Sequence, residues 1–142
     1  MQTTNSSQST AGPEYARIWV EALNRGDLSA ADSVFAPDCV VHFTGLAEPI
    51  RGVDAWKKAL GSYLAAFPDV QFTLDDHVQD GERVAHRWSC TGTHTGPLGS
   101  VAATGRRGTV TGMSFDRVVN GKVVERWEQF DYARMLQNIG LA

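Results

Sequence analysis

The sequence predicts an α+β fold, in which helices near the start of the chain pack against a strongly twisted, mostly antiparallel sheet. Three observations support this class. Apolar residues recur at helical spacing between residues 13 and 67, residues 70–93 alternate apolar with polar, and Asn120-Gly121 joins two strand-like runs. A twisted sheet that wraps a helix pair leaves a conical interior pocket between the two layers.

The helices are predicted from spacing and from their end signals. Pro13 suits a helix start, and Gly26 suits the left-handed residue after the first helix. One apolar stripe of this helix comprises Tyr15, Ile18, Trp19, Ala22 and Leu23. Shorter patterns predict a second helix over residues 28–35 and a third over residues 53–67.

The strands occupy most of the remaining chain. A short strand over residues 39–44 precedes a loop over residues 45–52. Later segments are predicted in this order: a strand over residues 70–79, a strand over 83–93, a loop over 96–108, the hairpin, and a closing helix over 132–139. Asp131 is the predicted N-cap of that helix.

The hairpin determines which side chains share a face. Both turn residues, Asn120 and Gly121, suit a two-residue turn with positive φ, which pairs Val119 with Lys122 and, counting outward, Met113 with Glu128. In this register Glu128 stands among Met113, Phe115 and Phe130. Apolar surroundings raise a carboxyl pKa, so Glu128 is a candidate proton-transfer group. The alternative is a solvated glutamate paired with Arg126 or Arg117.

Composition excludes several classes of partner. The formal charge is −3 and neither half carries a basic stripe, so we expect no nucleic-acid or anionic-membrane partner. The start lacks a signal-peptide pattern, and no apolar run approaches the roughly 20 residues that span a bilayer. We therefore expect a cytoplasmic protein, with a flexible polar tail over residues 1–12 and a single domain over residues 13–142.

Familiar segments recur through the chain in a definite order. They are F-P-D-V at Phe67 to Val70, G-T-H-T-G at Gly92 to Gly96, T-G-R-R at Thr104 to Arg107, V-N-G-K-V-V-E-R-W at Val119 to Trp127, and M-L-Q-N-I-G at Met135 to Gly140. From about Tyr15 onward the chain resembles the SnoaL-like polyketide cyclase family. That family belongs to the NTF2-like superfamily of cone-shaped α+β folds, and the resemblance implies the same cone here.

The resemblance also implies a chemistry. Family cyclases close the last ring of an aromatic polyketide methyl ester by an intramolecular aldol condensation, without metal or cofactor. Their acid/base aspartate corresponds to Glu128 here, a preceding histidine on the same face corresponds to Arg126, and a histidine of the neighbouring strand falls near Ser114. The family commonly forms homodimers, so we expect a homodimer or a higher homo-oligomer with Trp127 in its interface.

The predicted site combines these two lines of reasoning. Glu128 and His42 are the predicted catalytic groups, and no residues are assigned to a metal or a cofactor. The predicted substrate-binding residues are Trp19, Trp56, Tyr63, His86, Trp88, Met113, Phe115, Arg126 and Phe130. Alternatives remain open: Arg126 could hold a substrate carbonyl or neutralise Glu128, His42 and His86 could be wall or core residues, and His94 could tie down a loop.

The predicted function is a cofactor-free enzyme that acts on a hydrophobic, oxygenated small molecule. The reaction would be a polyketide ester cyclase-like aldol closure or an isomerase-type proton transfer, in the lyase and isomerase classes. One alternative is a non-catalytic domain that binds a small ligand or dimerises. Another is an epoxide-hydrolase-like enzyme, which needs two carboxylates and an arginine around one water. Glu128 and Arg126 supply two of these groups, and Asp76 supplies the third only if its strand face points into the cone.

Overall fold

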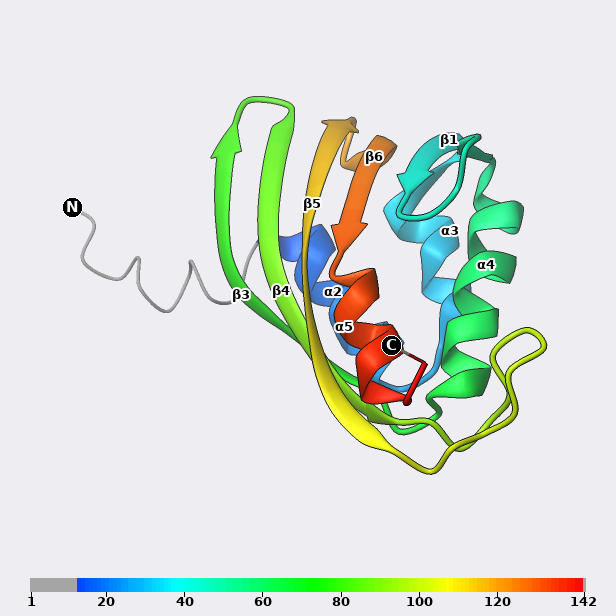
Figure 1. The fold of residues 1–142 in the computed structure, drawn as a ribbon. Coiled ribbons are helices and arrows are strands. Elements are labelled where there is room, and N and C mark those ends of the chain that lie inside the picture. Colours follow the sequence, from blue (N-terminus) through cyan, green and yellow to red (C-terminus); the bar gives the residue numbers. More distant parts are fainter. Residues whose placement is uncertain (1–12, 142) are drawn as a thin grey trace.

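The structure, a computed structural model, describes residues 13–141, so the predicted tail over residues 1–12 lies outside it. A curved six-stranded sheet, in the order β2-β1-β6-β5-β4-β3, wraps around the helices (Figure 1). Strand β1 runs parallel to β6, and the other neighbours are antiparallel. The predicted α+β class is confirmed. The elements are α2 (Glu14–Asn24), η1 (Leu28–Ala30), α3 (Ala31–Val34), β1 (Phe35–Phe43), β2 (Ile50–Arg51), α4 (Val53–Ala66), β3 (Gln71–Asp80), β4 (Arg83–Thr93), β5 (Arg107–Val119), β6 (Lys122–Phe130) and α5 (Tyr132–Asn138).

Helices α2 and α4 each bury part of the stripe that their spacing predicts, although Ile18 of α2 is 43% exposed. Helix α2 buries Trp19 and Leu23 on one face, and Gly26 follows it with φ 72°. Trp19 and Trp56 of α4 both pack edge-on against Phe35, at the start of β1. These three rings connect the two helices to the sheet in one hydrophobic core.

The C-terminal end of α2 is fixed to the edge of the sheet by one side chain. The Asn24 Nδ2 donates to the Phe72 carbonyl at 3.0 Å, and the Phe72 N–H donates to Asn24 Oδ1 at 2.7 Å. This pair of hydrogen bonds satisfies backbone groups of β3 that no further strand pairs. It therefore holds α2 against the concave face of the sheet, where the cavity lies.

The β5–β6 hairpin turns at Asn120-Gly121 as predicted, with both residues at positive φ. The predicted register beyond the turn is wrong. Val118 pairs with Val123, but Arg117 pairs with Glu125, so Val124 is an extra residue in β6. The bulge shifts the pairing by one residue, and Ser114 rather than Met113 lies opposite Glu128. A shift of one residue exchanges the two faces of a strand.

Two other segments differ from the prediction in a smaller way. Strand β1 begins at Phe35 rather than at residue 39, because its pairing with β6 resumes across an irregularity before Val40. The expected loop over residues 45–52 contains the two-residue strand β2. Short edge strands such as β2 carry too few residues for an alternating pattern to show in the sequence.

Candidate functional site

A cavity of about 150 Å³ lies between the concave face of the sheet and helices α2, α4 and α5. Most of its lining is apolar, with a few polar side chains from the central strands. The predicted site residues that line it are Trp19, Trp56, Tyr63, His86, Trp88, Arg126, Glu128 and Phe130. This combination of an apolar hollow and a few convergent polar groups is typical of a small-molecule site.

Three predicted site residues lie on the opposite, convex face of the sheet, so their placement in the pocket is wrong. Met113 and Phe115 are 60% and 42% exposed because the bulge at Val124 reverses the face that they occupy. His42 pairs with Trp127 across the parallel β1–β6 ladder and stacks on its ring. Its Nε2 lies 2.8 Å from Glu125 Oε2, outside the cavity.

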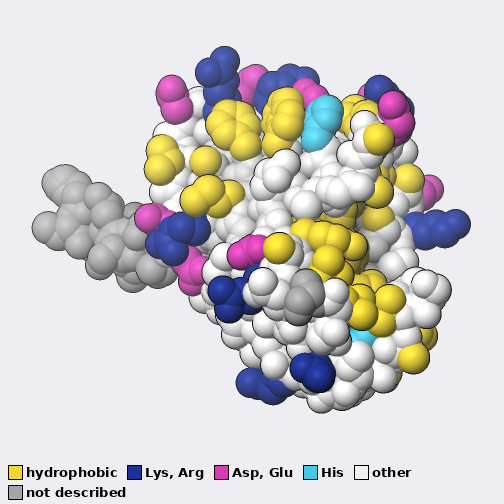
Figure 2. All heavy atoms as spheres, in the orientation of Figure 1, with side chains coloured by type: hydrophobic (Ala, Val, Ile, Leu, Met, Phe, Trp, Pro, Cys, Tyr) yellow, Lys and Arg dark blue, Asp and Glu magenta, His cyan; other side chains and the backbone are white. Residues whose placement is uncertain are grey.

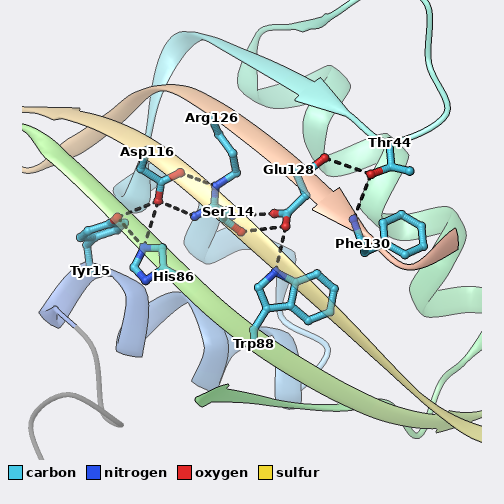
Figure 3. Close-up of polar contacts among 9 residues, drawn as sticks. All are labelled: Tyr15, Thr44, His86, Trp88, Ser114, Asp116, Arg126, Glu128 and Phe130. Atoms are coloured by element: carbon cyan, nitrogen blue, oxygen red, sulfur yellow. Dashed lines mark hydrogen bonds and ion pairs between the residues drawn. The ribbon is translucent and has the colours of Figure 1, made fainter. Parts of the chain in front are cut away.

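Glu128 lies in the cavity wall and is only 6% exposed. Its Oε2 accepts two hydrogen bonds, from Ser114 Oγ at 2.7 Å and from Trp88 Nε1 at 2.9 Å (Figure 3). The other oxygen, Oε1, lies 3.5 Å from Arg126 Nη1, beyond an ordinary hydrogen-bond length. Oε1 is therefore the oxygen left to bind a proton or a ligand.

The proton affinity of Glu128 is raised. Burial in the apolar wall raises its pKa above the ordinary value of 4.5, and the nearby charge of Arg126 and the Ser114 and Trp88 hydrogen bonds oppose this only in part. A carboxyl with a raised pKa binds a proton at a higher pH than a solvated one, so it can both take and return a proton.

Arg126 is engaged mainly by Asp116, a residue that the sequence did not single out. Asp116 is fully buried. Arg126 donates two hydrogen bonds to it, from Nε to Oδ1 at 2.7 Å and from Nη2 to Oδ2 at 2.8 Å. Although burial alone would raise it, the pKa of Asp116 is held far below its usual range by the Arg126 charge and hydrogen bonds, with help from His86 and Tyr15. Asp116 is thus the main counter-ion of Arg126, and Glu128 makes only the longer 3.5 Å contact with the same guanidinium.

The indole of Trp88 reaches Glu128 because it crosses Gly112 on the neighbouring strand. A Cβ at Gly112 would lie 2.3 Å from Trp88 Cζ2 and 2.8 Å from the Gln129 carbonyl oxygen. Glycine inside a strand commonly marks such a close approach. Gly112 therefore sets the position of the Trp88 N–H that binds Glu128.

We expect Gly112→Ala to displace the Trp88 ring and to lower the free energy of unfolding by about 1–3 kcal/mol, as overpacked sites do. Urea unfolding measures the loss, and the NMR signal of the Trp88 indole N–H reports the displacement. Gly61→Ala in α4 is the matched control, because the nearest neighbour of its added Cβ is Leu28 Cδ1 at 3.7 Å and alanine favours the helix. If both variants are equally stable, the contact at Gly112 does not matter.

The backbone at Glu128 is fixed by Thr44, which follows β1. Thr44 Oγ1 donates to the Glu128 carbonyl at 3.1 Å and accepts from the Phe130 N–H at 3.0 Å, as Figure 3 shows. The Thr44 N–H donates to the same Glu128 carbonyl at 3.2 Å. These contacts continue the β1–β6 pairing and hold the carboxylate-bearing strand in place.

Other candidate groups have structural partners or unreactive states. His94 Nδ1 accepts from the Thr104 N–H, so this histidine ties down the 94–106 loop, as one alternative held. Burial raises the pKa of the cavity thiol of Cys90 to about 11, which keeps it a neutral thiol.

Within residues 13–141 no group of three or more His, Cys, Asp or Glu side chains could hold a metal ion. In the same span every helix is too short or too polar to cross a bilayer.

The fold and the cavity define the class of protein. A curved sheet that wraps around helices and an apolar hollow is the NTF2-like cone. An NTF2-like protein of unknown function from Burkholderia pseudomallei has the same fold, with a TM-score of 0.74. It is 23% identical to this chain, over 89% of this chain and 95% of that one. A family model of SnoaL-like polyketide cyclases matches residues 14–139. The chain belongs to the SnoaL-like polyketide cyclase family.

Two solved structures share about a third of their residues with this chain. IdmH from Streptomyces antibioticus, a proposed polyketide cyclase, is 33% identical over 89% of this chain and 96% of that one, with a TM-score of 0.80. AclR from Streptomyces galilaeus, a proposed hydroxylase, is 31% identical over 90% of this chain and 80% of that one, also with a TM-score of 0.80. A search of curated proteins found no significant match.

Proposed function

We propose that the protein is a cofactor-free acid/base catalyst that closes a ring in a hydrophobic, oxygenated substrate of polyketide ester type. The observation that carries this proposal is Glu128, a carboxyl of raised pKa in an apolar cavity, whose Oε2 is held by two donors while Oε1 has no close hydrogen bond. Membership of the SnoaL-like family and the similarity to a proposed polyketide cyclase support the choice of reaction.

The proposed reaction needs only one carboxylate. Ionised Glu128 takes a proton from the carbon next to a substrate carbonyl, and the resulting enolate attacks a second carbonyl of the same molecule. A carbon–carbon bond forms, and the new alkoxide takes the proton back from Glu128. Substrate and product therefore have the same composition, and Glu128 ends ionised, as it began. A base whose pKa is closer to the working pH transfers protons more effectively.

The walls of the cavity contribute binding and exclusion of water. Trp19, Tyr63 and Phe130 offer aromatic surface to a flat, apolar substrate. Ser114 and Trp88 fix the carboxylate in one rotamer, which lowers the cost of orienting it for each turnover. Arg126 lies in the lining beside Glu128, where its charge can stabilise the developing enolate oxygen.

The chromatographic retention and the mass of the products test the proposed reaction. The protein is incubated with a linear aromatic polyketide methyl ester that carries adjacent dicarbonyl groups, and the products are analysed by liquid chromatography with mass spectrometry. Ring closure gives a new chromatographic peak whose mass equals that of the substrate, or is lower by one water if the product dehydrates. A gain of one oxygen atom would indicate hydroxylation, and a net loss of CH2 would indicate hydrolysis of the methyl ester. Either change would contradict the proposal, as would tight binding without conversion.

The hydrolase alternative is less well supported. Asp76 lies on the exposed part of β3, 3.8 Å from Arg87, because an irregularity between Leu74 and Asp76 breaks the expected alternation. Asp116 brings a second carboxylate to Arg126, but its oxygens are occupied by Arg126 and Tyr15 and it does not line the cavity. A water held between Glu128 and Asp116 would need that pair to open.

We also propose that a second copy of the chain covers the convex face of the sheet. Met113, Phe115 and Trp127 form a contiguous apolar patch there, and Figure 2 shows hydrophobic side chains gathered over the upper parts of these strands. Monomeric proteins rarely expose such patches, and a two-fold dimer would pair the patch with itself.

Sedimentation velocity tests the dimer. We expect the native chain to sediment as a dimer at micromolar concentration and Trp127→Glu to sediment as a monomer, because a buried charge would be unpaired. Leu46→Glu places the same charge on an exposed leucine outside the patch and should remain dimeric. A native monomer, or a dimer that tolerates Trp127→Glu, would refute this interface.

A further inference from the structure

His86 is the one buried histidine in the cavity lining, among the described residues, and only one edge of its ring is occupied. Its Nε2 lies 2.9 Å from Tyr15 Oη and 3.3 Å from Asp116 Oδ2. Its Nδ1 is buried and has no hydrogen-bond partner, and the His86 side chain as a whole is only 4% exposed. A buried polar atom without a partner is uncommon in native proteins and calls for an explanation.

The neighbours of the ring determine which nitrogen carries the proton. Tyr15 donates its single hydroxyl proton to Asp116 Oδ2 at 2.6 Å, so Tyr15 Oη can only accept from His86. Nε2 is therefore the protonated nitrogen, and in the neutral ring Nδ1 carries a free lone pair. Figure 3 shows the Nδ1 edge of the ring turned away from Asp116.

The sheet places His86 at a defined distance from Glu128. His86 pairs with Ser114, and Ser114 pairs with Glu128, so the three residues lie in one row across β4, β5 and β6. Adjacent strands are about 4.8 Å apart, which separates the backbones of His86 and Glu128 by about 10 Å. All three side chains line the same cavity.

We propose that His86 is a positioning residue whose Nδ1 accepts a hydrogen bond from a substrate hydroxyl, at the opposite end of the row from Glu128. The substrate is then an aromatic alcohol or enol that spans the width of about two fused rings between the two groups. Tyr15 and Asp116 hold the ring in the tautomer that accepts. This inference rests on the proposed function for the identity of Glu128 as the reacting group, but it concerns binding and can be tested without turnover.

The experiment compares two flat probes, β-naphthol and its methyl ether, which differ in the hydroxyl proton that His86 would accept. Isothermal titration calorimetry measures both dissociation constants for the full chain. We expect the naphthol to bind about three- to tenfold more tightly, the effect of one buried hydrogen bond. Nitrogen NMR of the imidazoles should show the His86 Nδ1 signal moving with the naphthol and not with the ether.

His86→Gln keeps an amide N–H near the position of Nε2 and removes Nδ1, so the preference for the naphthol should fall towards one. His42→Gln makes the same change on the convex face and should retain the preference. An unchanged preference in His86→Gln, or an Nδ1 signal that the naphthol does not move in the native protein, would overturn the inference. The NMR result decides the matter if His86→Gln does not fold. Because Glu128 Oε1 is also open to a hydroxyl, the His86→Gln comparison and the Nδ1 signal assign the preference to His86. Both are read without turnover, so a failed ring closure and a failed anchor are distinguishable.

Discussion

Glu128→Gln is expected to lower turnover of a ring-closing substrate about 10²–10⁴-fold, the usual contribution of a positioned acid/base group. Glutamine has nearly the same volume, and its amide oxygen can still accept from Ser114 and Trp88. It cannot take a proton from carbon, so binding should persist while the chemical step is lost. Steady-state kinetics with the cyclising ester measures kcat and KM separately, and the loss should fall on kcat.

Glu125→Gln is the matched control for this prediction. Glu125 lies on the same strand but on the convex face, where it contacts His42. Its replacement should leave turnover unchanged, and circular dichroism should show both variants folded. Equal activity in the two variants would mean that Glu128 is not the proton-transfer group, whatever the reaction.

Asp116→Asn is expected to lower the free energy of unfolding by about 3–5 kcal/mol, the largest stability effect of any single change considered. The reason is that Arg126 would remain buried with its main counter-charge removed, and Tyr15 and His86 would lose a charged partner. Urea unfolding, followed by circular dichroism, measures the change in stability.

Two further variants separate the burial of charge from the loss of a contact. Asp76→Asn removes a carboxylate from the exposed ion pair with Arg87 and should cost no more than about 1 kcal/mol. Combining Asp116→Leu with Arg126→Met removes both buried charges and should recover much of the lost stability. If Asp116→Asn costs no more than Asp76→Asn, the buried pair does not stabilise the fold.

Local signals predicted most of the secondary structure. The helical stripe that contains Trp19, the turn at Asn120-Gly121 and the cap at Asp131, which accepts from the Arg134 N–H, all depend on residues close together in the chain. The stripe, the turn and the cap need no knowledge of the tertiary structure. Glu128 was predicted from the family resemblance and from a hairpin register that set Met113 opposite it, and the structure contradicts that register.

The register of the hairpin could not be read from hydrophobic patterning, because the pattern is inverted here. Ser114 and Asp116 face inward, whereas Met113 and Phe115 face outward, so the apolar residues indicated the wrong face. Sequence rules fail where function or association competes with core formation. Pairing opposite charges across the strands would have set Asp116 against Arg126 and so identified the bulge.

Tyr15 could not have been predicted as a hydrogen-bond partner of Asp116. It meets Asp116 from a distance of 101 residues along the chain, and its spacing is that of an ordinary core position of a helix. Gly112 did carry a usable signal, because an isolated glycine inside a strand indicates close approach by another group. Here that group is the indole of Trp88.

The most direct test of the account is the titration of the Glu128 carboxyl itself, followed by NMR of the carboxyl carbons and assigned with Glu128→Gln. Because burial raises the pKa of Glu128, its signal should change at a pH above the ordinary 4.5, and the folded state should take up this proton before the unfolded chain does as the pH falls. The substrate-activating form is the ionised one, so turnover should rise with pH through the same midpoint. A Glu128 signal that titrates at or below 4.5 would contradict a carboxyl whose burial in the apolar wall outweighs the nearby charge of Arg126.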